Sequence, residues 1–187
     1  MPGRKKRMRK IPNSELGRPS AEEFAAMDKC PVVVVLDNIR SMNNVGSFFR
    51  TCDAFAMQGV YLCGITGVPP SREIHKTALG AELTVGWEHY ADTCEAVDRL
   101  RERGYTVLAV EQVEGAGRLD DWTPASGKRY ALVFGNEVSG VQQRVVDRCD
   151  GAVEIPQAGT KHSLNVAVSG GVVLWEFYRR WRPGRGE

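Results

Sequence analysis

Three short stretches of this sequence combine polar side chains and glycines at spacings that could support chemistry. In the first, NNVGSFFRTCDA (43–54), Asn43, Gly46 and Arg50 are spaced i, i+3 and i+7, so they share one face of a predicted helix. A guanidinium on that face could clamp a phosphate or stabilise a developing oxyanion, and we expect Gly46 to leave a groove beside its stem. The alternative is an ordinary helix start, with Asn43 or Asn44 as the N-cap and Arg50 in solvent.

The second stretch, YALVFGNEVSGV (130–141), runs from a hydrophobic strand straight into Gly135, Asn136 and Glu137. A glycine lets a ligand approach the backbone closely, and free amides at a strand-to-helix turn can hold polar atoms of a ligand. The stretch is therefore a candidate binding turn. A tight turn followed by a capped helix, with no ligand, is the alternative.

The third stretch, VEIPQAGTKHSLNV (153–166), joins a strand to the last predicted helix. Pro156 ends the strand, Gly159 permits a sharp bend, and Ser163 and Asn165 then surround the helix N-terminus. N-capping accounts for Ser163 but not for Asn165, which is left as a candidate functional residue. The neighbouring His162 is predicted to be a surface or loop residue.

The last predicted helix carries two adjacent glycines, Gly170 and Gly171, in its interior. Each glycine costs a helix about 1 kcal/mol relative to alanine. We therefore expect a second backbone or a cofactor to pack closely against them. The helix itself is predicted from one apolar stripe, made of Leu164, Val168, Val172 and Trp175.

The elements that must position these stretches alternate between strands and helices. Strands are predicted at 32–37, 60–64, 82–90, 105–111, 130–135 and 151–156, and helices at 21–28, 44–57, 71–80, 92–103, 139–149 and 163–181. The continuous apolar run VVVVLD is typical of a strand buried on both faces. The pattern predicts an α/β fold with a mostly parallel sheet flanked by helices. In such sheets ligands collect beyond the carboxyl ends of strands, where all three stretches lie.

Charge divides the chain into two predicted parts, a basic flexible tail over 1–19 and a single domain over 20–187. The first ten residues hold six basic side chains and no acid, and RRWRPGR (179–185) lies close to the other end. Such segments bind nucleic-acid phosphates or merely aid solubility. Ser20 and Glu23 form a predicted capping box for the first helix.

Several classes of protein are excluded by what the sequence lacks. Five cysteines with no CxxC pair argue against a disulfide framework or a zinc knuckle, and three histidines make a metal site improbable. No apolar run approaches the length of a membrane span, and no secretory signal is visible. The absence of GxGxxG argues against a dinucleotide site. A cytoplasmic protein is expected.

Taken together, the three stretches resemble the motifs of the SpoU (TrmH-like) family of RNA ribose 2′-O-methyltransferases, in the SPOUT superfamily. The first motif is matched by Asn44, Gly46 and Arg50. The second, a strand ending in G-x-E with a following glycine, is matched by Gly135, Glu137 and Gly140. The third, I-P-x-x-G and then S-L-N-V, is matched by Ile155, Pro156, Gly159, Ser163, Leu164, Asn165 and Val166. The resemblance covers about residues 32–178.

The resemblance implies a deep trefoil knot in the C-terminal half, a homodimer, and S-adenosylmethionine as a methyl donor held bent in the knot. The residues expected to bind this donor are Phe134, Gly135, Asn136, Ile155, Gly159, Ser163 and Leu164. Gln157 stands where family members commonly have methionine, and Gly170 and Gly171 stand where they often have alanine. These departures bear on the fine shape of the pocket.

The implied reaction moves a methyl group to a ribose 2′-hydroxyl of tRNA or rRNA, with phosphate contacts from the basic termini. The catalytic residues carried over are Arg50, Asn44, Glu137, Ser163 and Asn165. Arg50 would be either a base or, since guanidinium stays protonated, a phosphate clamp that stabilises the alkoxide. Two alternatives are a SPOUT-like protein that binds RNA without turnover and a knotted enzyme that methylates a base nitrogen.

Overall fold

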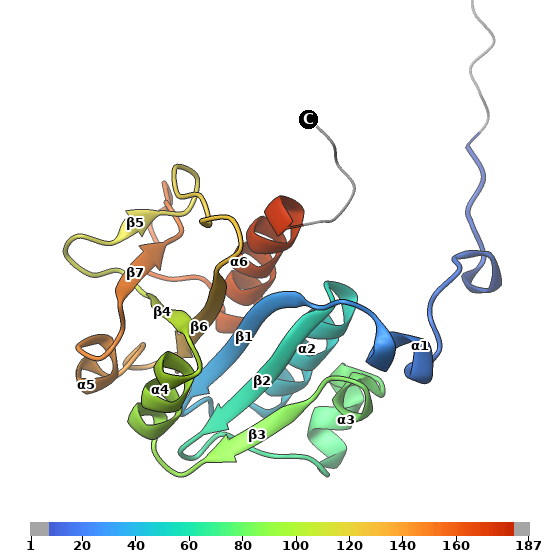
Figure 1. Ribbon diagram of the computed structural model, residues 1–187, viewed down its shortest axis with the longest axis horizontal. Coiled ribbons are helices and arrows are strands. Elements are labelled where there is room, and N and C mark those ends of the chain that lie inside the picture. The colour runs from blue at the N-terminus through green and yellow to red at the C-terminus, as the bar shows by residue number, and fades with distance from the viewer. Residues whose placement is uncertain (1–7, 182–187) are drawn as a thin grey trace, which may run out of the picture.

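Seven parallel strands form one sheet in the computed structural model, which describes residues 8–181 (Figure 1). They are β1 (Cys30–Asp37), β2 (Met57–Cys63), β3 (Trp87–Tyr90), β4 (Tyr105–Val110), β5 (Gly117–Arg118), β6 (Arg129–Gly135) and β7 (Gly151–Glu154). Their order across the sheet is β3-β2-β1-β6-β4-β7-β5, and each neighbouring pair runs parallel. The predicted α/β class and parallel sheet are confirmed. The short β5 lies between the strands predicted over 105–111 and 130–135, in a segment where no strand was predicted.

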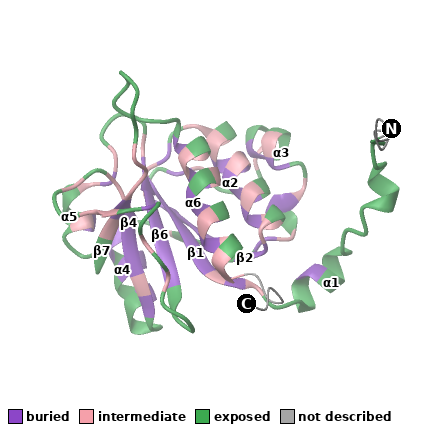
Figure 2. Ribbon diagram, turned by 90° about the horizontal axis from the view of Figure 1, so that it is seen from above, coloured by how far each residue is buried: buried purple, intermediate pink, exposed green. Residues whose placement is uncertain are grey.

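Helices cover both faces of this sheet, which gives three layers (Figure 2). The helical segments are η1 (Asn13–Glu15), α1 (Ala21–Ala26), α2 (Met42–Ala54), α3 (Arg72–Ala78), η2 (Ala81–Leu83), α4 (Thr93–Glu102), α5 (Gln143–Val146) and α6 (Val166–Trp181). The α2, α3 and α6 helices lie on one face, and α4 and α5 lie on the other. No helix within residues 8–181 is long and apolar enough to cross a membrane.

The β1 strand shows why a continuous apolar run suits this architecture. Val32, Val34 and Leu36 pack into the hydrophobic cluster that includes α2 and α6, whereas Val33 and Val35 pack into the cluster under α4. Successive side chains of a strand point to opposite faces, so a strand in the middle layer needs apolar residues at every position. The run therefore suits the position of β1 in the interior of the sheet, between β2 and β6.

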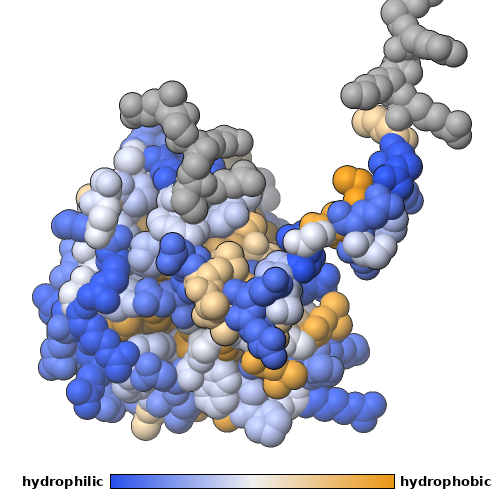
Figure 3. Space-filling model, turned by 45° about the vertical axis from the view of Figure 1, so that its right-hand side comes forward, coloured by the Kyte–Doolittle hydropathy of each residue, from blue (hydrophilic) through white to orange (hydrophobic). Residues whose placement is uncertain are grey.

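The segment before β1 projects from the body of the molecule (Figure 1) and exposes both hydrophilic and hydrophobic side chains (Figure 3). In α1 the Ser20 hydroxyl accepts the Glu23 N–H while the Glu23 carboxylate accepts the Ser20 N–H, which confirms the predicted capping box. Arg9 pairs with Glu15 at 2.6 Å. The predicted flexible tail stays a prediction, since residues 1–7, like residues 182–187, lie outside the described part of the chain.

Two predicted elements near the candidate site have other boundaries than expected. The helix predicted over 139–149 is reduced to the four residues of α5, because residues 136–142 form a turn instead. In this turn Asn136 and Gly140 form an antiparallel bridge, and the Asn136 side-chain oxygen accepts the N–H groups of Val138 and Ser139, both at 2.9 Å. The weak strand predicted over 82–90 divides into η2 and β3, with a short connection between them.

Gly46 is a contact between helices rather than a groove beside Arg50, so that expectation was wrong. A Cβ at Gly46 would lie 2.1 Å from the Thr77 hydroxyl oxygen and 2.3 Å from the Ile74 carbonyl oxygen of α3. The residue is buried. Glycine is therefore needed here so that α2 and α3 can approach each other closely.

The glycine pair of α6 divides between two environments. A Cβ at Gly170 would lie 2.3 Å from Cε1 of Phe48, so an aromatic ring of α2, not a second backbone or a cofactor, packs against this position. At Gly171 an added Cβ would meet nothing within 4 Å. The predicted close packing is thus found at Gly170, with a different partner, and is not found at Gly171 in the single chain.

The Gly46 contact gives a test of the packing between α2 and α3. We expect Gly46→Ala to lower the free energy of unfolding by about 1–3 kcal/mol, since the added methyl group overlaps a backbone carbonyl that cannot move freely. Gly86→Ala is the matched control, because its added Cβ would meet nothing within 4 Å. Urea denaturation of both variants measures the difference. Equal stability of the two variants would contradict the contact.

Candidate active site at the carboxyl edge of the sheet

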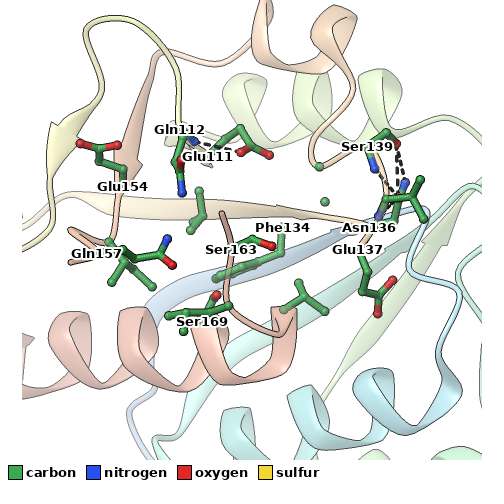
Figure 4. A pocket seen from close by; sticks show the side chains of 17 residues that line it. Glu111, Gln112, Phe134, Asn136, Glu137, Ser139, Glu154, Gln157, Ser163 and Ser169 are labelled. Atoms are coloured by element: carbon green, nitrogen blue, oxygen red, sulfur yellow. Dashed lines mark hydrogen bonds between the residues drawn. The ribbon is translucent and has the colours of Figure 1, made fainter. Parts of the chain in front are cut away.

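A cavity of about 260 Å³ opens where β4, β6 and β7 end, beside the start of α6 (Figure 4). Its wall contains predicted donor-binding residues from two of the three polar stretches, namely Phe134, Gly135, Asn136, Ile155, Ser163 and Leu164. The predicted residue Gly159 does not line it. Parallel strands bring their carboxyl ends to one edge, which is why residues far apart in sequence share this wall.

The turn after β6 owes its shape to two glycines. A Cβ at Gly135 would lie 1.9 Å from the Gly140 carbonyl carbon and 2.0 Å from the Val141 nitrogen, so only glycine lets the chain fold back on itself here. Gly140 has a φ of 66°, in the left-handed region. The turn exposes Glu137 and Val138 at its tip. It therefore forms a thin backbone wall along one side of the cavity.

A chain of hydrogen bonds joins the three polar stretches. The Asn44 amide on α2 donates to Glu137 on the turn after β6, and Glu137 extends toward α2 (Figure 4). The Asn165 amide donates in turn to the Asn44 side-chain oxygen over 3.4 Å. Three of the predicted catalytic residues are thus brought together next to the cavity. Of these three, only Glu137 also lines it.

Asn165, and not Ser163, is the N-cap of α6. The Asn165 side-chain oxygen accepts the N–H groups of Ala167 at 3.0 Å and Val168 at 3.3 Å, and the helix begins at Val166. The expectation that capping explains Ser163 was therefore wrong. Ser163 lies three residues before the first residue of the helix and lines the cavity. The side-chain oxygen of Asn165 caps the helix, while its NH2 group donates to Asn44. One side chain therefore serves a structural role and a contact within the site, because an amide carries both an acceptor and a donor.

Arg50 is not brought into the cavity wall of its own chain. It is exposed on α2, two turns beyond Asn43, and does not line the cavity. Among residues 8–181 it makes no hydrogen bond or ion pair. Asn43 also lies outside the cavity, and its carbonyl oxygen accepts the Thr77 hydroxyl at 3.0 Å. The guanidinium therefore stays available to an acidic or phosphate partner.

The end of β4 contributes cavity residues that the three stretches did not include. Glu111 and Gln112 line the cavity beside Val110 (Figure 4). The Gln112 side-chain amide donates to the His162 carbonyl oxygen at 3.0 Å. The other wall residues outside the predicted set are Val138, Ser139, Gly140, Glu154, Gln157, Val166 and Ser169. The signal for Glu111 and Gln112 was available, since the strand predicted over 105–111 also ends in polar residues.

The thiols and acidic groups of the described residues do not form a metal or nucleophile site. No group of three or more His, Cys, Asp or Glu side chains within residues 8–181 could hold a metal ion. Burial raises the pKa of the Cys30, Cys63 and Cys149 thiols to about 12, and it raises the pKa of Cys52 as well. Such thiols stay protonated at neutral pH and are poor nucleophiles.

Comparison with known proteins gives consistent matches over most of the chain. The sequence profile of the SpoU rRNA Methylase family matches residues 31–175. The chain is 33% identical over 169 residues to a tRNA (guanosine(18)-2′-O)-methyltransferase of Thermus thermophilus, an alignment that covers 89% of this chain and 84% of that one. An alignment of 148 residues at 31% identity, to a Staphylococcus haemolyticus protein named for the TrmH family of tRNA/rRNA methyltransferases, covers 79% of this chain. It covers only 58% of that relative, so this chain spans less than two thirds of its length.

The fold is also found among solved structures. An AdoMet-bound rRNA methyltransferase from Sinorhizobium meliloti superposes with a TM-score of 0.74 at 28% sequence identity. The superposition covers 83% of this chain and 59% of that one. The three-layer arrangement described above is therefore the arrangement of a known group of proteins.

The N-cap of α6 can be tested by substitution. We expect Asn165→Ala to lower the free energy of unfolding by about 0.5–2 kcal/mol, since two backbone N–H groups lose their acceptor. Asn165→Asp keeps the acceptor and should retain most of the stability. Ser163→Ala is the matched control, because Ser163 makes no hydrogen bond to the described residues. Thermal unfolding of the three variants decides the point, and a larger loss for Ser163→Ala would reverse the assignment.

Proposed function

Because this chain belongs to the SpoU rRNA Methylase family, we propose that it transfers a methyl group from S-adenosylmethionine to a ribose 2′-hydroxyl of tRNA or rRNA. The observation that carries the proposal is the convergence of the three family motifs beside one cavity, where Asn44, Glu137 and Asn165 are linked by hydrogen bonds. The Thermus thermophilus relative is named for this reaction on a guanosine of tRNA.

The chemistry of the cavity suits the proposed donor. Phe134, Ile155 and Leu164 supply apolar surface for a purine ring, and the glycine-containing turn supplies backbone groups that a polar ligand can approach. These backbone groups are accessible at Gly135 because the residue has no side chain, and even a Cβ there would overlap the backbone of Gly140. When bound, S-adenosylmethionine supplies a sulfonium methyl group, which is a strong electrophile. The protein then has to align the acceptor hydroxyl and assist loss of its proton.

In this proposal Arg50 clamps a phosphate of the RNA and stabilises the developing alkoxide. Guanidinium stays protonated in proteins, which favours a clamp over a base, so the proton leaves to phosphate or water. Asn44, Glu137, Ser163 and Asn165 orient the ribose. Since Arg50 does not line the cavity of its own chain, the Arg50 that serves a given cavity comes from the second copy of a homodimer.

An exposed apolar stripe on α6 supports the homodimer. Val168, Val172 and Trp175 are 53%, 42% and 47% exposed, although they lie one turn apart on a helix that otherwise packs well. With Gly171 and Pro156 they border a hollow of about 560 Å³. An apolar stripe of this kind marks an interaction surface, and the open space at Gly171 leaves room for a second chain.

We also propose the trefoil knot and the RNA contacts of the basic termini. The knot is supported by the family match over residues 31–175, since the knot is what the resemblance to this family implies. The RNA contacts are supported by the six basic residues among the first ten. A location in the cytoplasm accords with such a substrate.

The proposed activity and the role of Arg50 are tested in one assay. The protein is incubated with labelled S-adenosylmethionine and separate tRNA and rRNA pools, and the products are digested and analysed by nucleoside mass spectrometry. We expect label on a ribose, and none when the target carries a 2′-deoxyribose. Arg50→Ala should reduce transfer by about 10²–10³-fold, since it removes an electrostatic contact to the reacting groups.

Two controls keep this assay specific. Donor affinity of Arg50→Ala, measured by calorimetry, should equal that of the unmodified protein, because Arg50 does not line the cavity. Arg99→Ala removes an exposed arginine from α4, on the opposite face of the sheet, and should transfer normally. Label on a base would favour a base methyltransferase. Donor binding without any transfer would favour a binding protein, and substantial transfer by Arg50→Ala would exclude its proposed role.

The proposed dimer is tested at the α6 stripe. We expect Val172→Glu to convert the dimer to a monomer in sedimentation velocity at micromolar concentration, because a carboxylate would be buried without a partner. Leu83→Glu is the matched control, since Leu83 is 82% exposed on η2, away from α6. The idea fails if the unmodified protein sediments as a monomer or if Val172→Glu remains dimeric.

A further inference from the structure

The turn after β6 is bonded to two carboxylates, one from each of the strands that flank β6. β6 pairs with β1 and with β4, and each of these neighbours ends in an acidic residue, Asp37 for β1 and Glu111 directly after β4. The Asp37 carboxylate accepts the Gln142 N–H at 3.0 Å, and the Glu111 carboxylate accepts the Val141 N–H at 2.9 Å. Two consecutive amides at the end of the turn are thus held by two different strands.

Asp37 is fully buried and receives only neutral donors. Its Oδ1 accepts the Thr93 hydroxyl at 2.6 Å and the side-chain amides of Gln142 and Asn38, each at 2.8 Å. Its Oδ2 accepts the Gln142 backbone N–H. Among residues 8–181 it forms no ion pair with an Arg, Lys or His. A carboxylate offers acceptors at both oxygens, which no neutral side chain of the same size does.

Glu111 lies directly against Gly140, the glycine at the end of the turn, whose left-handed φ of 66° already favours glycine. A Cβ at Gly140 would lie 2.1 Å from Oε2 of Glu111, the oxygen that accepts the Val141 N–H. The other oxygen accepts the Gln112 N–H at 2.9 Å. The side chain therefore fits directly beneath the turn, and it also lines the cavity (Figure 4). A side chain at Gly140 would therefore displace the Glu111 carboxylate from the Val141 N–H.

We propose that Asp37 and Glu111 are positioning residues, which hold the turn 136–142 in its cavity-forming shape and thereby set the affinity for the methyl donor. The proposal rests on the proposed function, since it assumes that the donor occupies this cavity. The turn is fixed by β6 at Gly135 and by the two carboxylates at Val141 and Gln142. Glu137, which contacts Asn44, lies between these fixed ends, so its position depends on them.

Asp37→Asn isolates the contact to the turn. Its remaining oxygen can keep the three donors that Oδ1 accepts, while the new amide group replaces Oδ2 and faces the Gln142 N–H, a donor opposite a donor. Thr93→Val is the matched control, because it removes a hydrogen bond to the same carboxylate without touching the turn. Glu111→Gln is a second variant at a half-buried position, where folding is less at risk.

Donor binding is measured by calorimetry with S-adenosylmethionine, and turn rigidity by hydrogen exchange of the Val141 and Gln142 amides. We expect Asp37→Asn and Glu111→Gln each to weaken donor binding about tenfold and to speed exchange at these two amides. Asp37→Asn leaves the Gln142 N–H without its acceptor, and Glu111→Gln leaves one oxygen for the two N–H groups, of Val141 and Gln112, that the carboxylate accepts. In the methylation assay the KM for the donor should rise more than kcat falls. Thr93→Val should change stability but neither donor affinity nor exchange at the turn.

The outcomes separate this proposal from the proposed function. If the unmodified protein binds no S-adenosylmethionine, the proposed function fails. The anchoring of the turn is then judged by hydrogen exchange alone. The positioning role is overturned if both carboxylate variants bind the donor as tightly as Thr93→Val does, or if Val141 and Gln142 exchange in all three variants at the rate of the unmodified protein.

Discussion

The contact of Gly135 with the backbone of Gly140 and Val141 is the constraint on which the site depends. With no side chain at Gly135, the chain leaving β6 folds back on itself within seven residues, and the resulting turn forms a thin wall beside the cavity. A methyl group at Gly135 would separate the two backbone segments and displace Glu137 from Asn44. The order of the strands also constrains the turn. β6 lies between β1 and β4, and acidic residues at the ends of both neighbours bond to the turn.

The described site relies on hydrogen bonds rather than on reactive groups. The linked residues Asn44, Glu137 and Asn165 are two amides and a carboxylate, and the cysteines are protonated by burial. Transfer from an activated methyl donor suits such a site, because alignment of the acceptor supplies much of the acceleration. The exposed Arg50 has no ion-pair partner among residues 8–181, and a phosphate is the ligand that the geometry of its guanidinium favours.

The structure of one chain leaves two features unexplained that a second copy would explain together. The α6 stripe of Val168, Val172 and Trp175 is exposed, and Arg50 is separated from the cavity. Gly171 belongs to the same surface, since an added Cβ there meets nothing. Gly170, its neighbour, packs on Phe48 inside the chain. Two adjacent glycines therefore lie in two different environments, one packed within the chain and one open at its surface.

The sequence alone determined the longer strands, the faces of the sheet to which the β1 side chains point and the motif residues, because these follow from local periodicity and from short spacings such as that between Gly135 and Glu137. It predicted the meeting of the three polar stretches, since parallel strands end at one edge. Three outcomes were decided only by tertiary structure: Asn165 rather than Ser163 caps α6, Gly46 packs against α3, and Glu111 joins the cavity. The contact at Gly46 and the place of Glu111 in the cavity depend on neighbours far away in the chain, whose distance in space no local pattern encodes. The cap depends on the residue at which α6 begins, since Asn165 bonds to Ala167 and Val168.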